Sequence, residues 1–131
     1  MTPELTALAL AAFVHIISFV AYSYMANVDV GLGYSTSPRD SAPSRDMRVV
    51  TMRLSRAYDN SAAMFGLFAG GALMISVTGQ STVYTGGLAF AYVALRAGYT
   101  LAYARGWRPW RSYIWICALL CCALLYLAAL F

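Results

Sequence analysis

Apolar residues fall into four long runs that are separated by polar connections. The runs cover about residues 5–28, 61–78, 82–104 and 112–131. A helix needs roughly 20 apolar residues to cross a bilayer, within a range of about 17–25. The second run is short, so we expect its helix to begin earlier, near Met47, with its charged half outside the hydrocarbon. The pattern predicts an all-α membrane protein, a bundle of four transmembrane helices.

Composition agrees with a membrane setting. The chain has 131 residues, of which 61% are hydrophobic and 11% are charged, whereas about 25% of the residues of soluble domains are charged. At this length we expect a single domain over 1–131. The first run does not read as a signal peptide, because its apolar part is too long and Glu4 is the only charge before it.

The three connections differ in charge, and this difference predicts an orientation. Residues 29–48 are rich in Gly, Ser, Pro, Asp and Arg, 78–81 are uncharged, and 105–111 are basic. All nine basic residues are arginine, and each lies in, or opens toward, the first or third connection. The positive-inside rule therefore places loops 29–48 and 105–111 in the cytoplasm and both termini on the extracytoplasmic side.

The stretch "RLSRAYDNSAAMF" (53–65) carries charge directly into the second run. Arg53, Arg56 and Asn60 share one helix face at i, i+3 and i+7. Ionisable residues in a span normally face the bundle interior or a wet cavity. One alternative is that these arginines extend to the membrane–water interface or form contacts between helices. Asp59 could also pair with Arg56.

A second polar stripe lies in the third run, where Tyr99 and Tyr103 follow Arg96 at i+3 and i+7. A guanidinium and two phenols on one face suit the binding of a carboxylate. The alternative is an internal ion pair between Arg96 and Asp59, with no ligand.

A third basic cluster, "WRPWRSYIW" (107–115), opens the last run. Pro109 suits a first helical turn, so Arg111 and Ser112 are expected near a helix N-terminus, which favours anions. Three basic clusters thus converge on one membrane face, and the chain has only five acidic residues. This surplus of arginine predicts an anionic ligand.

These segments resemble the membrane-associated proteins in eicosanoid and glutathione metabolism (MAPEG), in particular their bacterial branch. The resemblance covers nearly the whole chain and is carried by "VGLGYSTSPRD" (30–40), "RLSRAYDN" (53–60) and "RAGYTLAYARGWRPWRS" (96–112). It implies a homotrimer in a bacterial inner membrane, in contact with lipids and a lipophilic small-molecule substrate. It also implies glutathione bound between subunits near the cytoplasmic face, for transfer to lipophilic electrophiles or reduction of lipid peroxides.

Carried over position by position, the resemblance assigns roles to individual residues. The implied glutathione-binding residues are Arg53, Arg56, Asn60, Arg96, Tyr99 and Tyr103. The implied catalytic residues are Arg111 and Ser112, which would face the sulfur. An arginine beside a thiol lowers its pKa and raises the fraction of nucleophilic thiolate.

One position departs from the family pattern. The family places a glutamate three residues after the asparagine, and this chain has Ala63 there. A relative that binds an anionic lipid or peptide without catalysis, or only packs as a trimer, is therefore the alternative. A small proton-coupled transporter is disfavoured, since such proteins need an acid deep in a span.

The remaining features indicate structure more than chemistry. "GLFAG" (66–70) provides a small-xxx-small face for close helix packing. His15 is expected to form an interhelical hydrogen bond. Cys117, Cys121 and Cys122 have no metal-site spacing and are expected to be small packing residues. The arginines lie along membrane spans, so their positive charge does not suggest nucleic-acid binding.

Overall fold

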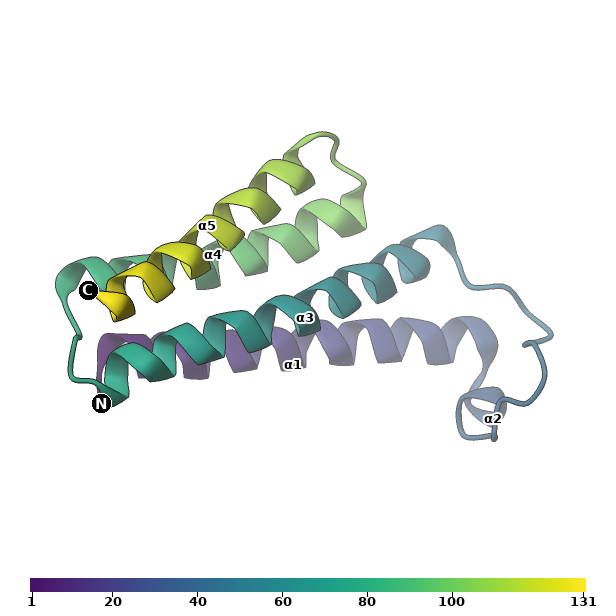
Figure 1. The fold of residues 1–131 in the computed structure, drawn as a ribbon. Coiled ribbons are helices and arrows are strands. Elements are labelled where there is room, and N and C mark those ends of the chain that lie inside the picture. The colour runs from purple at the N-terminus through teal and green to yellow at the C-terminus, as the bar shows by residue number, and fades with distance from the viewer.

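The computed structural model describes residues 1–131 and contains only helices and connections. The helices are α1 (Pro3–Val30), α2 (Leu32–Ser35), α3 (Val49–Val77), α4 (Val83–Arg105) and α5 (Trp110–Leu130). The four long helices run up and down. Both termini and the α3–α4 connection lie at one end, and the loop that contains α2 and the α4–α5 connection lie at the other (Figure 1). α4 packs against α1, α3 and α5.

The four predicted apolar runs all form helices, but they are not equally apolar. Three helices, α1, α3 and α5, are long and apolar enough to cross a membrane. α4 is also long, with 23 residues, but Arg96, Arg105 and several Thr, Tyr and Gly residues dilute its apolar character. Length and composition therefore identify three spans where the sequence pattern predicted four.

Local capping explains where α1 and α4 begin and where α4 ends. Thr2 accepts a hydrogen bond from the Leu5 N–H at the start of α1. Thr82 and Thr85 form a reciprocal capping box at the start of α4, which satisfies two donors that the helix itself leaves free. Gly106 ends α4 in the left-handed conformation, with φ +70°, a region that glycine adopts without a steric penalty.

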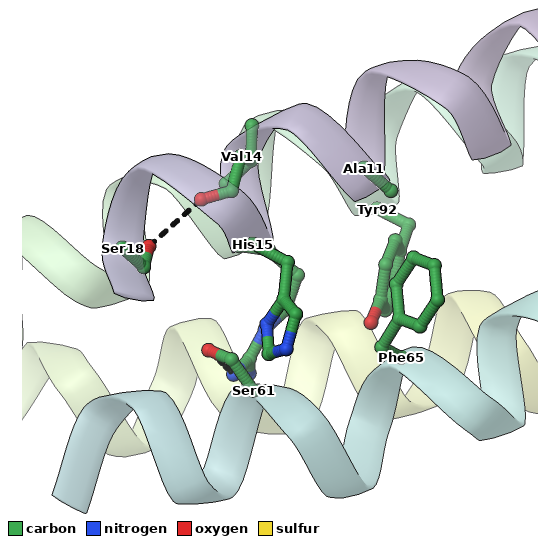
Figure 2. Close-up of a pocket in the computed structure, with 8 residues that line it drawn as sticks. Ala11, Val14, His15, Ser18, Ser61, Phe65 and Tyr92 are labelled. Carbon is green, nitrogen blue, oxygen red and sulfur yellow. Dashed lines mark hydrogen bonds between the residues drawn. The ribbon is translucent and has the colours of Figure 1, made fainter. Parts of the chain in front are cut away.

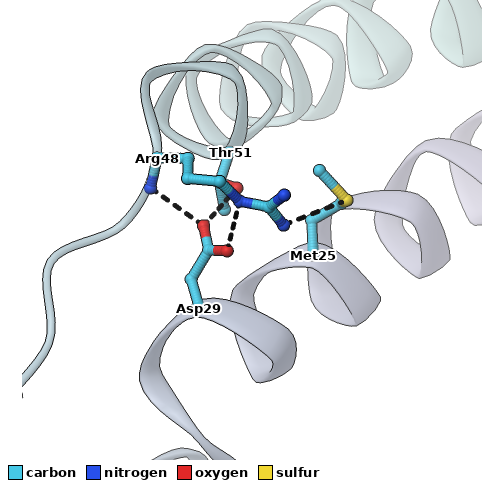
Figure 3. A network of polar contacts seen from close by, with 4 residues as sticks. All are labelled: Met25, Asp29, Arg48 and Thr51. Carbon is cyan, nitrogen blue, oxygen red and sulfur yellow. Dashed lines mark hydrogen bonds and ion pairs between the residues drawn. The ribbon is translucent and has the colours of Figure 1, made fainter.

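The start of α3 is capped by a residue of another helix. Asp29, in the last turn of α1, accepts hydrogen bonds from the Arg48 backbone N–H at 2.9 Å and from the Thr51 hydroxyl at 2.5 Å (Figure 3). Arg48 also pairs with this carboxylate through Nε at 2.6 Å. The 29–48 connection is thus more ordered than its composition predicts: it begins inside α1 and contains α2.

A second buried carboxylate joins α1 to α4 at the opposite end of the bundle. Glu4 has no exposed surface. Its two oxygens accept hydrogen bonds from Thr85 Oγ1 at 2.5 Å and from Ser81 Oγ at 2.8 Å. Each oxygen of this acid therefore has a hydroxyl donor within the chain.

The core between the long helices combines one aromatic stack with small residues. Phe68 of α3 and Tyr92 of α4 stack at 4.0 Å between ring centroids. Gly70 and Gly71 allow α5 to approach α3 closely at Tyr126. Gly66, however, is exposed with no atom near its missing side chain. The predicted small-residue face therefore contributes to helix packing within the chain only at its C-terminal glycine.

Candidate functional site

Arginines from three parts of the chain line a cleft at the end of the bundle where α3 and α5 begin and α4 ends. We call it the arginine cleft; its volume is about 250 Å³. It is lined by Val49, Met52, Arg53, Arg56, Tyr103, Gly106, Arg108 and Arg111. No acidic residue is among them. Because guanidinium groups bind planar oxyanions through paired hydrogen bonds, the cleft is suited to an anionic ligand.

Two of these arginines are held by neighbouring groups. The Arg53 guanidinium lies against Gly106, so close that a side chain at this position would meet Nη1 at 2.8 Å. Arg111 lies over the Tyr103 ring, with its guanidinium carbon 4.6 Å from the ring centroid. A ring face attracts a cation and limits its rotation. The sequence therefore sets the direction of Arg111 through a residue of the neighbouring helix.

A second cleft adjoins the first through Arg111, which lines both. We call it the Tyr99 cleft; its volume is about 360 Å³, and its lining residues are Asn60, Tyr99, Arg111, Ser112, Trp115 and Ile116. It is less charged than the arginine cleft and includes an indole and an aliphatic side chain. The pair of clefts offers a charged compartment beside an amphipathic one, with Arg111 between them.

The start of α5 differs slightly from its prediction. Pro109 is the residue before the helix, and α5 begins at Trp110 without a side-chain cap. The Ser112 backbone N–H donates to the Pro109 carbonyl at 3.0 Å. The Arg111 side chain, rather than the backbone N–H groups of this helix start, is therefore the group here that could bind an anion.

Arg96 is the one predicted site residue that lines neither cleft. It is 4% exposed, and its Nη2 donates hydrogen bonds to Asn60 Oδ1 at 3.1 Å and to Ser61 Oγ at 2.6 Å. Its guanidinium carbon also lies 4.3 Å from the centroid of the Tyr99 ring. Arg96 is thus connected to the Tyr99 cleft through Asn60 and Tyr99, and its side chain points into the bundle.

Neither ion pair considered from the sequence forms. The only ion pair in the chain joins Arg48 to Asp29. Asp59 is exposed and pairs with neither Arg56 nor Arg96. Arg96 does not pair with Asp59 because the Arg96 side chain turns into the bundle toward Asn60 and Ser61, whereas the Asp59 side chain points to the outside. The cleft arginines therefore keep their charge unpaired by any acid of the chain.

Several residues emerge only from the structure. Arg108 and Trp115 line the clefts, and their positions in the basic "WRPWRSYIW" segment were the available signal.

His15 stacks on Tyr58 and Phe65, with ring centroids 4.8 and 5.7 Å apart. Its Nδ1 has no hydrogen-bond partner, so the predicted interhelical hydrogen bond through this atom is absent.

The cysteines lie away from both clefts. All three are free, Cys121 and Cys122 are buried and Cys117 is exposed. The two buried thiols belong to the apolar core, as their predicted packing role requires. No group of three metal-ligating side chains gathers in the chain.

Comparison with known proteins gives one match. Residues 4–131 match the model of the MAPEG family, which covers the predicted spans and both clefts. No curated protein and no solved structure matches the chain.

Proposed function

Because the chain belongs to the MAPEG family, we propose that this membrane protein is a glutathione-dependent transferase or peroxidase that acts on lipophilic electrophiles. The observation that carries the proposal is the arginine cleft, where Arg53, Arg56, Arg108 and Arg111 meet without an acid. Glutathione has two carboxylates and one amine, so it supplies the negative charge that the chain does not.

The two clefts suggest a division of roles. Arg53 and Arg56 would bind the carboxylates of glutathione in the arginine cleft. Asn60, Tyr99 and Tyr103 would orient the peptide from the side of α3 and α4. Small-molecule sites typically measure about 300–1,000 Å³, so the two clefts, which measure about 250 and 360 Å³, would together provide enough room.

Arg111 is the residue that we propose for thiol activation. It lines both clefts and lies over the Tyr103 ring. A fixed guanidinium beside a thiol favours the thiolate, which is the attacking nucleophile. Ser112, in the Tyr99 cleft, would donate a hydrogen bond to the same sulfur. Trp115 and Ile116 would then contact the apolar electrophile.

The proposal includes an arrangement in the membrane. We infer a homotrimer of four-span subunits in a bacterial inner membrane, with glutathione bound between neighbouring subunits and both termini extracytoplasmic. The distribution of arginine between the loops supports the orientation. Exposed residues form part of the lining of both clefts, which is consistent with a partner subunit completing them. Native mass spectrometry that shows a stable monomer or dimer would contradict the intersubunit site.

A second candidate is a family member that binds an anionic lipid or peptide without catalysis. Two observations favour it: Ala63 occupies the position of the family glutamate, and Arg96 is hydrogen-bonded within the bundle to Asn60 and Ser61. In this case the arginine cleft would still bind an anion, but no activated thiol would form.

The experiment that separates the two candidates measures binding and turnover on the same detergent-purified protein. We expect glutathione and an S-alkyl analogue to raise the melting temperature. We also expect Arg111→Ala to reduce turnover of a lipophilic electrophile by about tenfold or more, the equivalent of about 1.4 kcal/mol. Arg39→Ala, which removes an exposed loop arginine, is the matched control. Stabilisation by anionic lipid but not by glutathione would favour the second candidate.

A further inference from the structure

A small cavity lies inside the bundle between α1, α3 and α4, separate from both clefts. It is lined by Ala11, Val14, His15, Ser18, Ser61, Phe65, Tyr92 and Arg96, and its volume is about 10 Å³. His15 reaches from α1 toward Ser61 on α3, and Ser18 turns back to its own helix (Figure 2). Such a volume has room for about one particle of the size of water.

The guanidinium of Arg96 borders this cavity, and three of its five N–H donors are unused. Nη2 is bonded to Asn60 and Ser61, but Nε and Nη1 are buried and have no acceptor. A buried donor without a partner destabilises the fold, and more so when it carries charge. These donors therefore indicate a missing acceptor inside the bundle.

The chain offers no negative charge to this arginine. Its only ion pair is far from the cavity, at Asp29 and Arg48, and Glu4 is bound by Thr85 and Ser81 at one end of the bundle. The Tyr99 ring covers one face of the guanidinium, but a ring face accepts no in-plane hydrogen bond from Nε or Nη1. Buried charges in proteins are normally paired, and Arg96 is not.

Two further groups at the cavity are suited to an anion. The Nδ1 of His15 is buried and has no partner, so in the tautomer with a proton on Nδ1 it is a free donor. Ser61 Oγ accepts from Arg96 and keeps its own hydroxyl proton to donate. Ser18 is not available in the same way, because its hydroxyl donates to the Val14 carbonyl at 2.9 Å.

We propose that this cavity binds one small monatomic anion of the chloride type as the counter-ion of Arg96. Nε and Nη1 of Arg96 hold it, and His15 and Ser61 donate from α1 and α3. At about 10 Å³ the cavity has room for a single small particle. An ion of the size of chloride needs a slight outward shift of the lining side chains, and a carboxylate, a phosphate or glutathione would need a much larger one. The anion joins three helices in place of an internal salt bridge, and this role is independent of any ligand in the clefts.

The wild-type protein tests the proposal directly by crystallography. Crystals grown without chloride and soaked in bromide should show an anomalous peak within hydrogen-bond distance of Arg96 Nε and Nη1. A cavity that contains only water, with no such peak, overturns the proposal. A peak of the same height in crystals of Arg96→Gln means an adventitious ion only and overturns it as well.

A solution measurement adds a readout that does not depend on crystals. At constant ionic strength, with gluconate as the replacing anion, chloride should raise the melting temperature along a saturating curve. Arg96→Gln should shift the half-saturation concentration upward by about tenfold or more, since one charged hydrogen bond corresponds to at least about one decade in affinity. Arg56→Gln, which removes a cleft arginine, should leave this curve unchanged.

The result also separates this proposal from the glutathione proposal. If Arg56→Gln abolishes the chloride effect and Arg96→Gln does not, chloride binds in the arginine cleft and the interior site is wrong. If Arg96→Gln does not fold, Ser61→Ala and His15→Phe should each weaken the chloride effect, and failure of both to do so overturns the site. None of these outcomes depends on turnover or on glutathione.

Discussion

The Asp29 cluster and the arginine cleft lie at the same end of the bundle, but they satisfy their charges in opposite ways. Asp29 has three donors within 2.9 Å, supplied by Arg48 and Thr51. The arginine cleft has four guanidinium groups and no acid in its lining. At one site the chain completes its own polar contacts, and at the other it leaves them open to the solvent or to a ligand.

Glu4 is satisfied within the chain in the same way as Asp29, but at the opposite end of the bundle. It is fully buried, and both of its oxygens are hydrogen-bonded to hydroxyls of the segment that opens α4. Satisfied acids thus hold α1 to α3 at one end and α1 to α4 at the other. A structural role accounts for these acids, whereas the cleft arginines have no acid of the chain as a partner and are left to water or to a ligand.

The largest expected effect comes from breaking the Asp29 cluster. Asp29→Ala should lower the melting temperature in detergent by about 5–15 °C, because the N-terminus of α3 loses its cap and Thr51 is left without a partner. Asp29→Asn should lower it less, because one amide oxygen still accepts a hydrogen bond. Asp59→Ala, at an exposed and unpaired aspartate, is the control and should have almost no effect.

A smaller loss of stability is expected at the opposite end. Glu4→Ala should lower the melting temperature by about 5–10 °C, since the Thr85 and Ser81 hydroxyls lose their acceptor. Glu4→Gln should retain most of the stability, because an amide oxygen replaces one acceptor and Ser81 can accept from the amide N–H. Equal losses for both substitutions would show that the negative charge, and not the hydrogen bonds, fixes this end.

Substitutions in the arginine cleft should change ligand binding and not stability, the reverse of what is expected for Asp29 and Glu4. Arg56→Ala should weaken glutathione binding by about ten- to a hundredfold, because a hydrogen bond to a charged group contributes about 1.5–3 kcal/mol. The melting temperature without ligand should stay the same or rise, since Arg56 is exposed and one of four like charges is removed. Isothermal titration calorimetry and a thermal scan on the same samples measure both quantities. A large loss of stability with unchanged affinity would make Arg56 structural.

The apolar pattern of the sequence predicted where the long helices lie, because a helix in a membrane must be both long and apolar. α4 begins at Val83 and ends at Arg105, close to the predicted 82–104. The helix spacing also placed Arg53 and Arg56 on one face, and both line the same cleft. These successes depend on a local period of 3.6 residues, which a single sequence contains.

The contacts between segments that are distant in the chain could not be predicted from this helical period. Asp29 is 19 residues from Arg48 in the chain, and Glu4 is 81 residues from Thr85. Arg96 is hydrogen-bonded to Asn60 and Ser61 and not to the neighbouring Asp59, because the side chain of Asp59 points away from α4. The sequence shows that a polar residue in a span needs a hydrogen-bond partner, but the packing of the helices determines which residue that partner is.

The smallest expected effect concerns how Arg111 is oriented. Its guanidinium lies 4.6 Å from the centroid of the Tyr103 ring, and a contact of this kind contributes about 0.5–1 kcal/mol when it is exposed. Tyr103→Leu should therefore reduce turnover by about two- to fivefold, because Arg111 loses the ring face that limits its rotation. Tyr103→Phe keeps that face and should retain the turnover if stacking is what matters. Steady-state kinetics with glutathione and a lipophilic electrophile distinguish the two substitutions. If Phe and Leu reduce the rate equally, the Tyr103 hydroxyl acts on the ligand itself, and the ring is not what positions Arg111.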